Sequence, residues 1–170
     1  MARVSGKSVV EEKGQRTARS TDVYQTRGRM KEAGLCRKCG VLFRNKRWTI
    51  AEEEVARARK EGALHSILCP SCQREEDGNP AGIVTLGGDY LQLHEELILN
   101  SVRNVESRSR AKNPLGRIMA ISRSGDGVTI ATTEDKLAQK LGREIFKAHK
   151  GDLSFRWNQA ENLVRVNWSR

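Results

Sequence analysis

The sequence is poor in aromatic residues, and it has no apolar run long enough to cross a lipid bilayer. Aromatic side chains make up 5% of the 170 residues and hydrophobic side chains 37%, so we expect a modest hydrophobic core. No basic amphipathic helix with bulky aromatic residues is evident either. These absences argue against a membrane partner.

Recognisable catalytic motifs are also missing. The sequence has no glycine-rich phosphate loop, no G-x-S-x-G and no H-E-x-x-H pattern. His94, Glu95 and Glu96 are consecutive, but neighbouring residues on a helix do not face one another, so they form no site by themselves. We therefore expect that the protein is not an enzyme and has no small-molecule substrate.

Cysteine is scarce as well, and all four cysteines fall into two C-x-x-C pairs. Each pair can direct two thiolates at one metal ion, and two pairs complete the tetrahedral set of a closed site. Four protein ligands leave no open position for catalysis, so the site is expected to be structural. We predict one Zn²⁺ ion bound by Cys36, Cys39, Cys69 and Cys72.

Three other uses of these cysteines remain open. Two disulfides are typical of secreted proteins, and no signal peptide is evident. A redox C-x-x-C pair is expected in a βαβ context, which the pattern here lacks. An iron–sulfur cluster also takes four thiolates, and the spacing alone does not separate it from zinc. Paired cysteines with none left over fit a reducing, cytoplasmic compartment.

Positive charge is what the sequence has in excess. The formal net charge is +10 and the sequence pI is about 9.8, which favours a polyanionic partner, with nucleic acid first. Solubility alone is the competing interpretation. Beside the first cysteine pair, cations flank Trp48, which could stack on a base or instead pack over the metal site. The candidate nucleic-acid-binding residues are Arg27, Arg29, Arg37, Lys38, Arg44, Lys46, Arg47, Trp48, Arg108, Arg110 and Lys112.

Composition divides the N-terminal half of the chain into two parts. Residues 1–33 are polar and basic without apolar periodicity, which predicts a disordered arm. Residues 34–80 hold both cysteine pairs and are expected to form a zinc ribbon with an inserted helix. A capping box from Thr49 to Glu52 predicts the start of that helix, and Gly62 predicts its end.

The C-terminal half predicts an α+β fold. Residues 81–113 read as a short strand, a long helix from about Tyr90 to Arg108, and a basic linker. The apolar stripe expected on that helix consists of Leu93, Leu97, Ile98, Val102 and Val105. Residues 114–170 predict a β-β-α-β-β unit, with four antiparallel strands and one helix across one face. Arg156 and Arg165 would lie on the other face, which is either an RNA surface or an ordinary solvated one.

Several motifs together resemble known proteins. The cysteine pairs, the segment Thr132-Thr133-Glu134-Asp135-Lys136-Leu137-Ala138 and the segment Asn162-Leu163-Val164-Arg165-Val166-Asn167-Trp168 resemble a group of small bacterial zinc-ribbon proteins. Residues 128–168 are also similar to part of the large-ribosomal-subunit export adaptor of the nonsense-mediated-decay-three type. That family carries cysteine-pair zinc ribbons and binds the large subunit near its tRNA exit-site side. This chain has one four-cysteine set where the adaptor has more, so the resemblance implies ribosome binding but not nuclear export.

Charge, cysteine pairs and resemblance lead to one expectation. The protein is a non-catalytic, cytoplasmic zinc-ribbon protein that binds ribosomal RNA or the ribosome, in particular the large subunit. It would act as an assembly, occupancy or dormancy factor. The alternatives are a DNA-binding zinc-ribbon regulator and a protein-interaction scaffold whose charge serves solubility.

Overall fold

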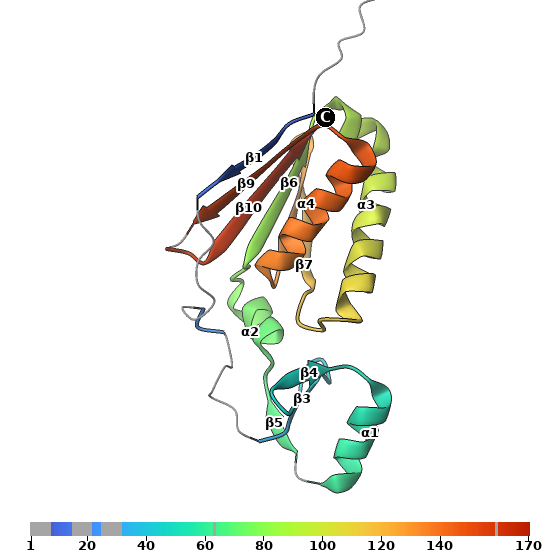
Figure 1. The fold of residues 1–170 in the computed structure, drawn as a ribbon, viewed down its shortest axis with the longest axis vertical. Coiled ribbons are helices and arrows are strands. Elements are labelled where there is room, and N and C mark those ends of the chain that lie inside the picture. The colour runs from blue at the N-terminus through green and yellow to red at the C-terminus, as the bar shows by residue number, and fades with distance from the viewer. Residues whose placement is uncertain (1–7, 15–21, 25–31, 63, 159) are drawn as a thin grey trace, which may run out of the picture.

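The computed structural model describes residues 8–14, 22–24, 32–62, 64–158 and 160–170, which form a mixed α+β protein with four helices and two sheets (Figure 1). The α+β class expected from the sequence is therefore confirmed. In chain order the elements are β1 (Val10–Lys13), β2 (Gly34–Cys36), β3 (Leu42–Arg44), β4 (Arg47–Thr49), α1 (Glu52–Glu61), β5 (His65–Ile67), α2 (Pro70–Asp77), β6 (Gly82–Gly87), α3 (Asp89–Arg110), β7 (Ile118–Ser124), β8 (Gly127–Thr132), α4 (Asp135–His149), β9 (Asp152–Asn158) and β10 (Leu163–Ser169).

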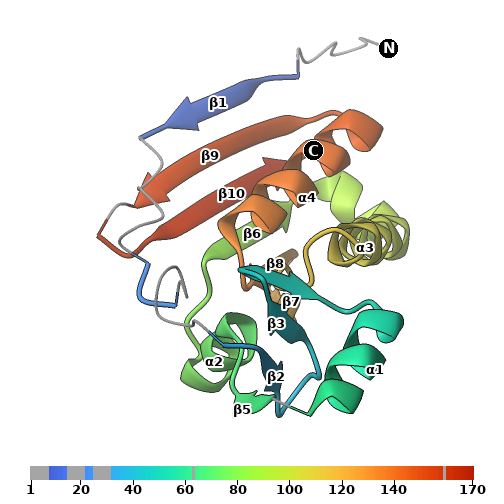
Figure 2. The ribbon, with the colours of Figure 1, turned by 60° about the horizontal axis from the view of Figure 1, so that its bottom comes forward.

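The larger sheet has the strand order β1-β9-β10-β6-β8-β7, and α3 and α4 lie side by side on one of its faces (Figures 1 and 2). Side chains alternate along each strand, so Phe155, Val166 and Val84 point under the helices and are fully buried. They share one core with the apolar faces of both helices. We call this unit the sheet domain.

The expected sheet of four antiparallel strands is wrong in its number and pairing of strands. β6 lies between β10 and β8 and runs parallel to β10, and β1 adds a parallel edge strand beside β9. A second helix, α3, shares the core with α4. The expected boundary between residues 113 and 114 therefore falls inside one sheet and one core. Pairing of β6 with β10 joins segments about 80 residues apart, which no local pattern predicts.

The expectation that residues 1–33 are disordered is wrong for two short pieces. β1 pairs with β9, although all four of its side chains are exposed, because main-chain hydrogen bonds complete the open edge of β9. Residues 22–24 dock on α2, where Tyr24 is buried. Arg27 and Arg29, the predicted nucleic-acid contacts of the arm, lie outside the described residues.

α3 does not bury the stripe that its sequence predicts. The backbone of His94 is non-helical, with φ −129° and ψ 18°. Because of this kink, the side chains before it are rotated about the helix axis relative to those after it. Leu93 is 81% exposed and Leu97 55% exposed. The buried residues are instead Leu91, Ile98, Leu99, Val102 and Val105. Only the C-terminal part of the predicted stripe is confirmed.

α4 packs unusually close to the sheet. Gly142 faces Val166, and a Cβ atom at this position would lie 2.5 Å from the nearest methyl carbon of Val166. Gly82 on β6 faces α4 in the same way. A Cβ atom added to it would lie too close to the Cβ atom of Ala138 for a normal van der Waals contact. Two glycines thus set the helix–sheet distance, and larger residues there would push the layers apart.

The cysteine module comprises residues 32–80 and contains the second sheet, of order β4-β3-β2-β5, together with α1 and α2. The predicted capping box is absent: the Thr49 hydroxyl accepts a hydrogen bond from the Ala51 N–H (3.1 Å), and Ala51 is the N-cap of α1 without a side-chain cap. α1 ends at Gly62 as predicted, with φ at 84°. None of the described helices has the length and apolar character needed to cross a membrane.

Candidate metal centre

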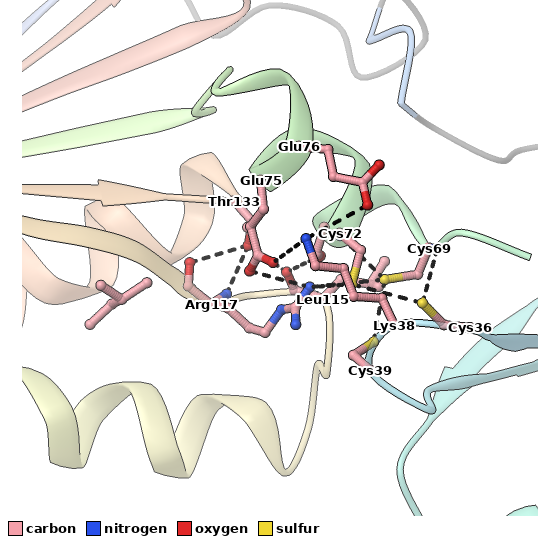
Figure 3. Close-up of polar contacts among 12 residues, drawn as sticks. Cys36, Lys38, Cys39, Cys69, Cys72, Glu75, Glu76, Leu115, Arg117 and Thr133 are labelled. Atoms are coloured by element: carbon pink, nitrogen blue, oxygen red, sulfur yellow. Dashed lines mark hydrogen bonds and ion pairs between the residues drawn. The ribbon is translucent and has the colours of Figure 1, made fainter.

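The four cysteine sulfurs lie within 4.8 Å of one another. Cys36 ends β2 and Cys39 lies in the turn that follows, while Cys69 precedes α2 and Cys72 lies in its first turn (Figure 3). Cys36, Cys69 and Cys72 are buried and Cys39 is exposed. Among the described residues this is the one group of candidate ligands close enough to hold a metal ion.

The local backbone points the sulfurs at a common centre. The first pair sits in a turn closed by the Gly40 N–H donating to the Cys36 carbonyl (2.9 Å), and Gly40 has φ 73°, which glycine adopts without strain. Pro70 occupies the first turn of α2, where its missing N–H is harmless. The N–H of Cys72 donates to the Cys69 sulfur and the N–H of Cys69 to the Cys36 sulfur, both at 3.4 Å. These bonds orient lone pairs and favour thiolates.

The sulfur spacing fits a tetrahedral metal ion. With metal–sulfur bonds of ~2.3 Å, a tetrahedron has sulfur–sulfur edges of about 3.8 Å. The Cys36 and Cys72 sulfurs are 3.8 Å apart, and the Cys39 and Cys69 sulfurs 3.6 Å. A disulfide would need about 2.05 Å, and all four cysteines are free. The donor set and its geometry therefore suit a closed four-thiolate site.

The four thiols do not ionise equally. Burial opposes ionisation of Cys36, but backbone N–H groups of Cys69, Cys39 and Lys38 outweigh it and lower the pKa of this thiol to about 6. Burial raises the pKa of Cys69 and of Cys72. A bound cation would favour the thiolate form of each of them, because a metal ion competes with protons for the same sulfur.

Arg117 reaches the centre from the sheet domain. Its Nη2 donates to the Cys72 sulfur at 3.3 Å and lies 3.9 Å from the Cys69 sulfur, and it is 3.5 Å from a carboxylate oxygen of Glu75 (Figure 3). Burial lowers the pKa of Arg117, but the hydrogen bond to Cys72 and the negative charges of Cys72, Glu75 and Cys39 together outweigh it, so the net shift is upward. Arg117 therefore stays charged beside sulfurs that become anionic when a metal binds.

The chain around Leu115 also connects the cysteine module to the sheet domain. The Ser71 hydroxyl on α2 donates to the Leu115 carbonyl (2.5 Å), which also accepts from the Thr133 hydroxyl (2.6 Å). Leu115 packs against the cluster of Cys36, Cys69 and Cys72. Thr133 thus holds this loop and does not cap α4, whose N-cap is Glu134. The sequence did not mark Arg117 or Leu115, since both are more than 40 residues from Cys72.

A second buried network anchors residues 22–24. Arg74 on α2 is 5% exposed, donates to Asp22 (2.7 Å) and to the Asn79 carbonyl (3.1 Å), and lies over the Tyr24 ring at 4.2 Å. The Tyr24 hydroxyl donates to Asp77 (2.8 Å), and burial raises the pKa of Tyr24. α2 therefore presents one face to the cysteines and another to the N-terminal segment.

Several predicted nucleic-acid contacts already have partners in the protein. Lys38 lies 3.8 Å from Glu75 and 3.7 Å from Glu76, and Arg44 lies 2.8 Å from Glu61. Trp48 is half-buried; its ring centroid is 4.9 Å from that of Phe43, and it packs against the cysteine cluster. Trp48 therefore packs over the cysteine cluster, one of the two roles expected for it, and part of its surface remains accessible.

Within the described residues, the predicted contacts other than Lys38 lie in four places. Arg44, Arg47, Trp48 and Lys112 line one groove of about 880 Å³. Arg37 lines a different hollow of about 340 Å³, with Arg59 and His65. Lys46 is exposed in the β3–β4 turn. Arg108 and Arg110 are exposed on the last turn of α3.

A scan against protein-family models, a search of the curated proteins and a search of the solved structures each found no match to this chain. The resemblance drawn from the motifs therefore stays an expectation.

Proposed function

We propose that this protein is a non-catalytic zinc-ribbon protein that binds ribosomal RNA or the ribosome. The observation that carries the proposal is a row of cations across the face of the larger sheet that the helices leave open. Lys13, Arg156 and Arg165 occupy directly adjacent positions on β1, β9 and β10. All three are exposed, and the neighbouring residues on the same strands, Phe155 and Val166, are buried under the helices.

An anionic ligand would stabilise this row, because two acidic neighbours offset its positive charge only in part. Like charges directly opposite on neighbouring strands destabilise a sheet. Glu11 lies 2.8 Å from Lys13 and Glu161 lies 3.4 Å from Arg165; within the described ranges Arg156 makes no ion pair, although its charge also acts on Glu11. The spacing of the strands places neighbouring backbone positions of this row about 5 Å apart. A phosphate backbone offers negative charges at a comparable spacing, so RNA is a fitting partner for this face.

Zinc is the metal we assign to the four-thiolate site. A closed set of four cysteine sulfurs is typical of structural Zn²⁺, which has no redox chemistry and tolerates the fixed geometry. When bound, it would hold the two cysteine pairs together and contribute to folding. Elemental analysis of purified protein tests this assignment directly. One zinc per chain would support it, whereas iron with acid-labile sulfide would show that the site holds an iron–sulfur cluster.

The metal site also gives the basic hairpin a rigid base. β3 and β4 are joined by Asn45 and Lys46, with φ 50° and 61°, which is the backbone of a type I′ turn. Lys46 in the turn and Arg47 at the start of β4 are both exposed. In the proposed role this hairpin would contribute phosphate contacts beside those of the sheet face.

The experiment is co-sedimentation of the tagged protein with cell lysate on sucrose gradients at low and high salt. We expect migration with large subunits or whole ribosomes that weakens as salt rises, because each phosphate contact releases counterions. The variant Arg156→Ser/Arg165→Ser should weaken it further at a given salt. Protein that stays at the top of every gradient would rule out the ribosomal role and leave duplex DNA or a protein partner to be tested.

A further inference from the structure

The groove beside the cysteine module is the strongest unexplained feature of the surface. It has a volume of about 880 Å³ and lies between the β3–β4 hairpin, α1 and the chain that follows α3. Its lining includes Arg47, Trp48, Glu53, Glu54, Arg57 and Lys112. Its volume falls within the range of sites that enclose small ligands, about 300–1,000 Å³.

Trp48 is a fixed aromatic surface in this groove. It packs against Phe43 and the cysteine cluster, and these contacts hold its ring in place. The part that stays accessible lines the groove. An indole held in this way can stack on a flat ligand without losing much conformational freedom.

The groove is lined by charges of both signs, and α1 carries both Glu53 and Arg57. Arg47, Arg57 and Lys112 are exposed and make no ion pair within the described part of the chain, whereas Arg44 is already paired with Glu61. Glu53 and Glu54, at the start of α1, place carboxylates in the same groove. A free phosphate would be repelled by these carboxylates. A nucleotide fits both signs, because its phosphate is anionic and its base edge carries N–H donors.

We propose that this groove binds an unpaired nucleotide of RNA, with its base stacked on Trp48, its phosphate near Arg47 and Lys112, and its base edge towards Glu53. The inference rests on the proposed RNA-binding function and specifies one contact surface for it. Unpaired loops and bulges are the parts of RNA whose bases are free to leave the stack. A duplex keeps its bases stacked and would meet only the rim of the groove.

The test measures fluorescence anisotropy with a labelled single-stranded oligoribonucleotide and with the same strand annealed to its complement. The groove variant is Arg47→Ser/Lys112→Ser. Its matched control is Lys136→Ser/Lys140→Ser on α4, where both lysines are exposed, so both variants lose the same charge. All four side chains are exposed, and unchanged metal content and circular dichroism confirm that each variant is folded.

We expect the wild type to prefer the single strand and the groove variant to lose at least about tenfold more affinity for it than the control. Trp48→Leu should weaken single-strand binding about 5- to 150-fold, the usual range for losing one base–aromatic stack. Equal losses in the two double variants, or equal binding of both RNA forms, would overturn the groove while leaving ribosome co-sedimentation intact. Wild-type protein that sediments with ribosomes but ignores the oligoribonucleotide would overturn the groove alone. Absence of both forms of binding would overturn the groove and the proposed function together.

Discussion

Replacing Arg117 with methionine tests whether the sheet domain stabilises the metal centre. Methionine has a similar length and no charge, so the packing around residues 115–118 is largely kept. The change removes the donor that lies 3.3 Å from the Cys72 sulfur and 3.9 Å from the Cys69 sulfur. It also removes the cation 3.5 Å from Glu75, which leaves that carboxylate near anionic sulfurs.

The expected size of the effect follows from the position of the guanidinium. A divalent ion bound by four thiolates has net negative charge, and a cation about 4 Å away stabilises one negative charge by about 4 kcal/mol at an effective dielectric constant of about 20. The Arg117 side chain is 11% exposed, so the desolvation of its own charge offsets part of this. Loss of a partner beside the ligands of a metal typically lowers affinity about 10- to 100-fold, or about 1.4–2.8 kcal/mol. We expect a decrease in zinc affinity within that range.

The assay is zinc titration of the metal-free protein in competition with a chromophoric chelator. The control is Arg123→Met, which loses the same charge from an exposed ion pair with Glu95 on the sheet domain. Arg123→Met should bind zinc as the wild type does. If Arg117→Met also bound zinc within about twofold of the wild type, the inference that Arg117 supports the thiolates would be refuted.

Three further outcomes are expected. Removal of the metal by a chelator should abolish hydrogen-exchange protection over residues 34–77 but not in the larger sheet, because the small core of the cysteine module consists largely of its ligands; uniform loss would contradict this. In urea unfolding, Leu91→Ala should cost about 2–5 kcal/mol and Leu93→Ala about 0.5 kcal/mol or less, because only Leu91 is buried; equal costs would refute the kink in α3. Burial, with smaller contributions from His94 and Arg170, lowers the pKa of His149, so the unfolded chain binds more protons below about pH 6.5. Stability should therefore fall as pH drops below that value, and His149→Gln should flatten the slope of melting temperature against pH.

Local patterns in the sequence predicted local structure well. The β-β-α-β-β order expected for residues 114–170 is present as β7, β8, α4, β9 and β10. The two cysteine pairs predicted that four sulfurs meet, and they do. The strand and helix patterns span a few residues each, so backbone geometry alone accounts for them. The meeting of the two cysteine pairs joins positions 30 or more apart and was predicted from the chemistry of four thiolates.

The mistaken expectations involve contacts or distortions that no local pattern encodes. The stripe through Leu93 and Leu97 assumed a regular α3, and the kink at His94 removes both from the core. Residues 10–13 have no buried side chain, so only the open edge of β9 explains why they form a strand. The Thr49 hydroxyl forms a local turn in place of a helix cap, an alternative that its sequence equally allows.

The sequence by itself determined the class of the fold, the set of cysteines that cluster and the net positive charge of the chain. Residue types, short spacings and charge are properties of the chain in any conformation. Only the tertiary structure decided that Arg117 faces the cysteine sulfurs, that β6 lies between β10 and β8, and that Lys112 shares a groove with Trp48. Each of these brings together residues more than 40 positions apart. Such meetings depend on how the whole core packs, because closing a long loop is repaid only by contacts made elsewhere in the fold.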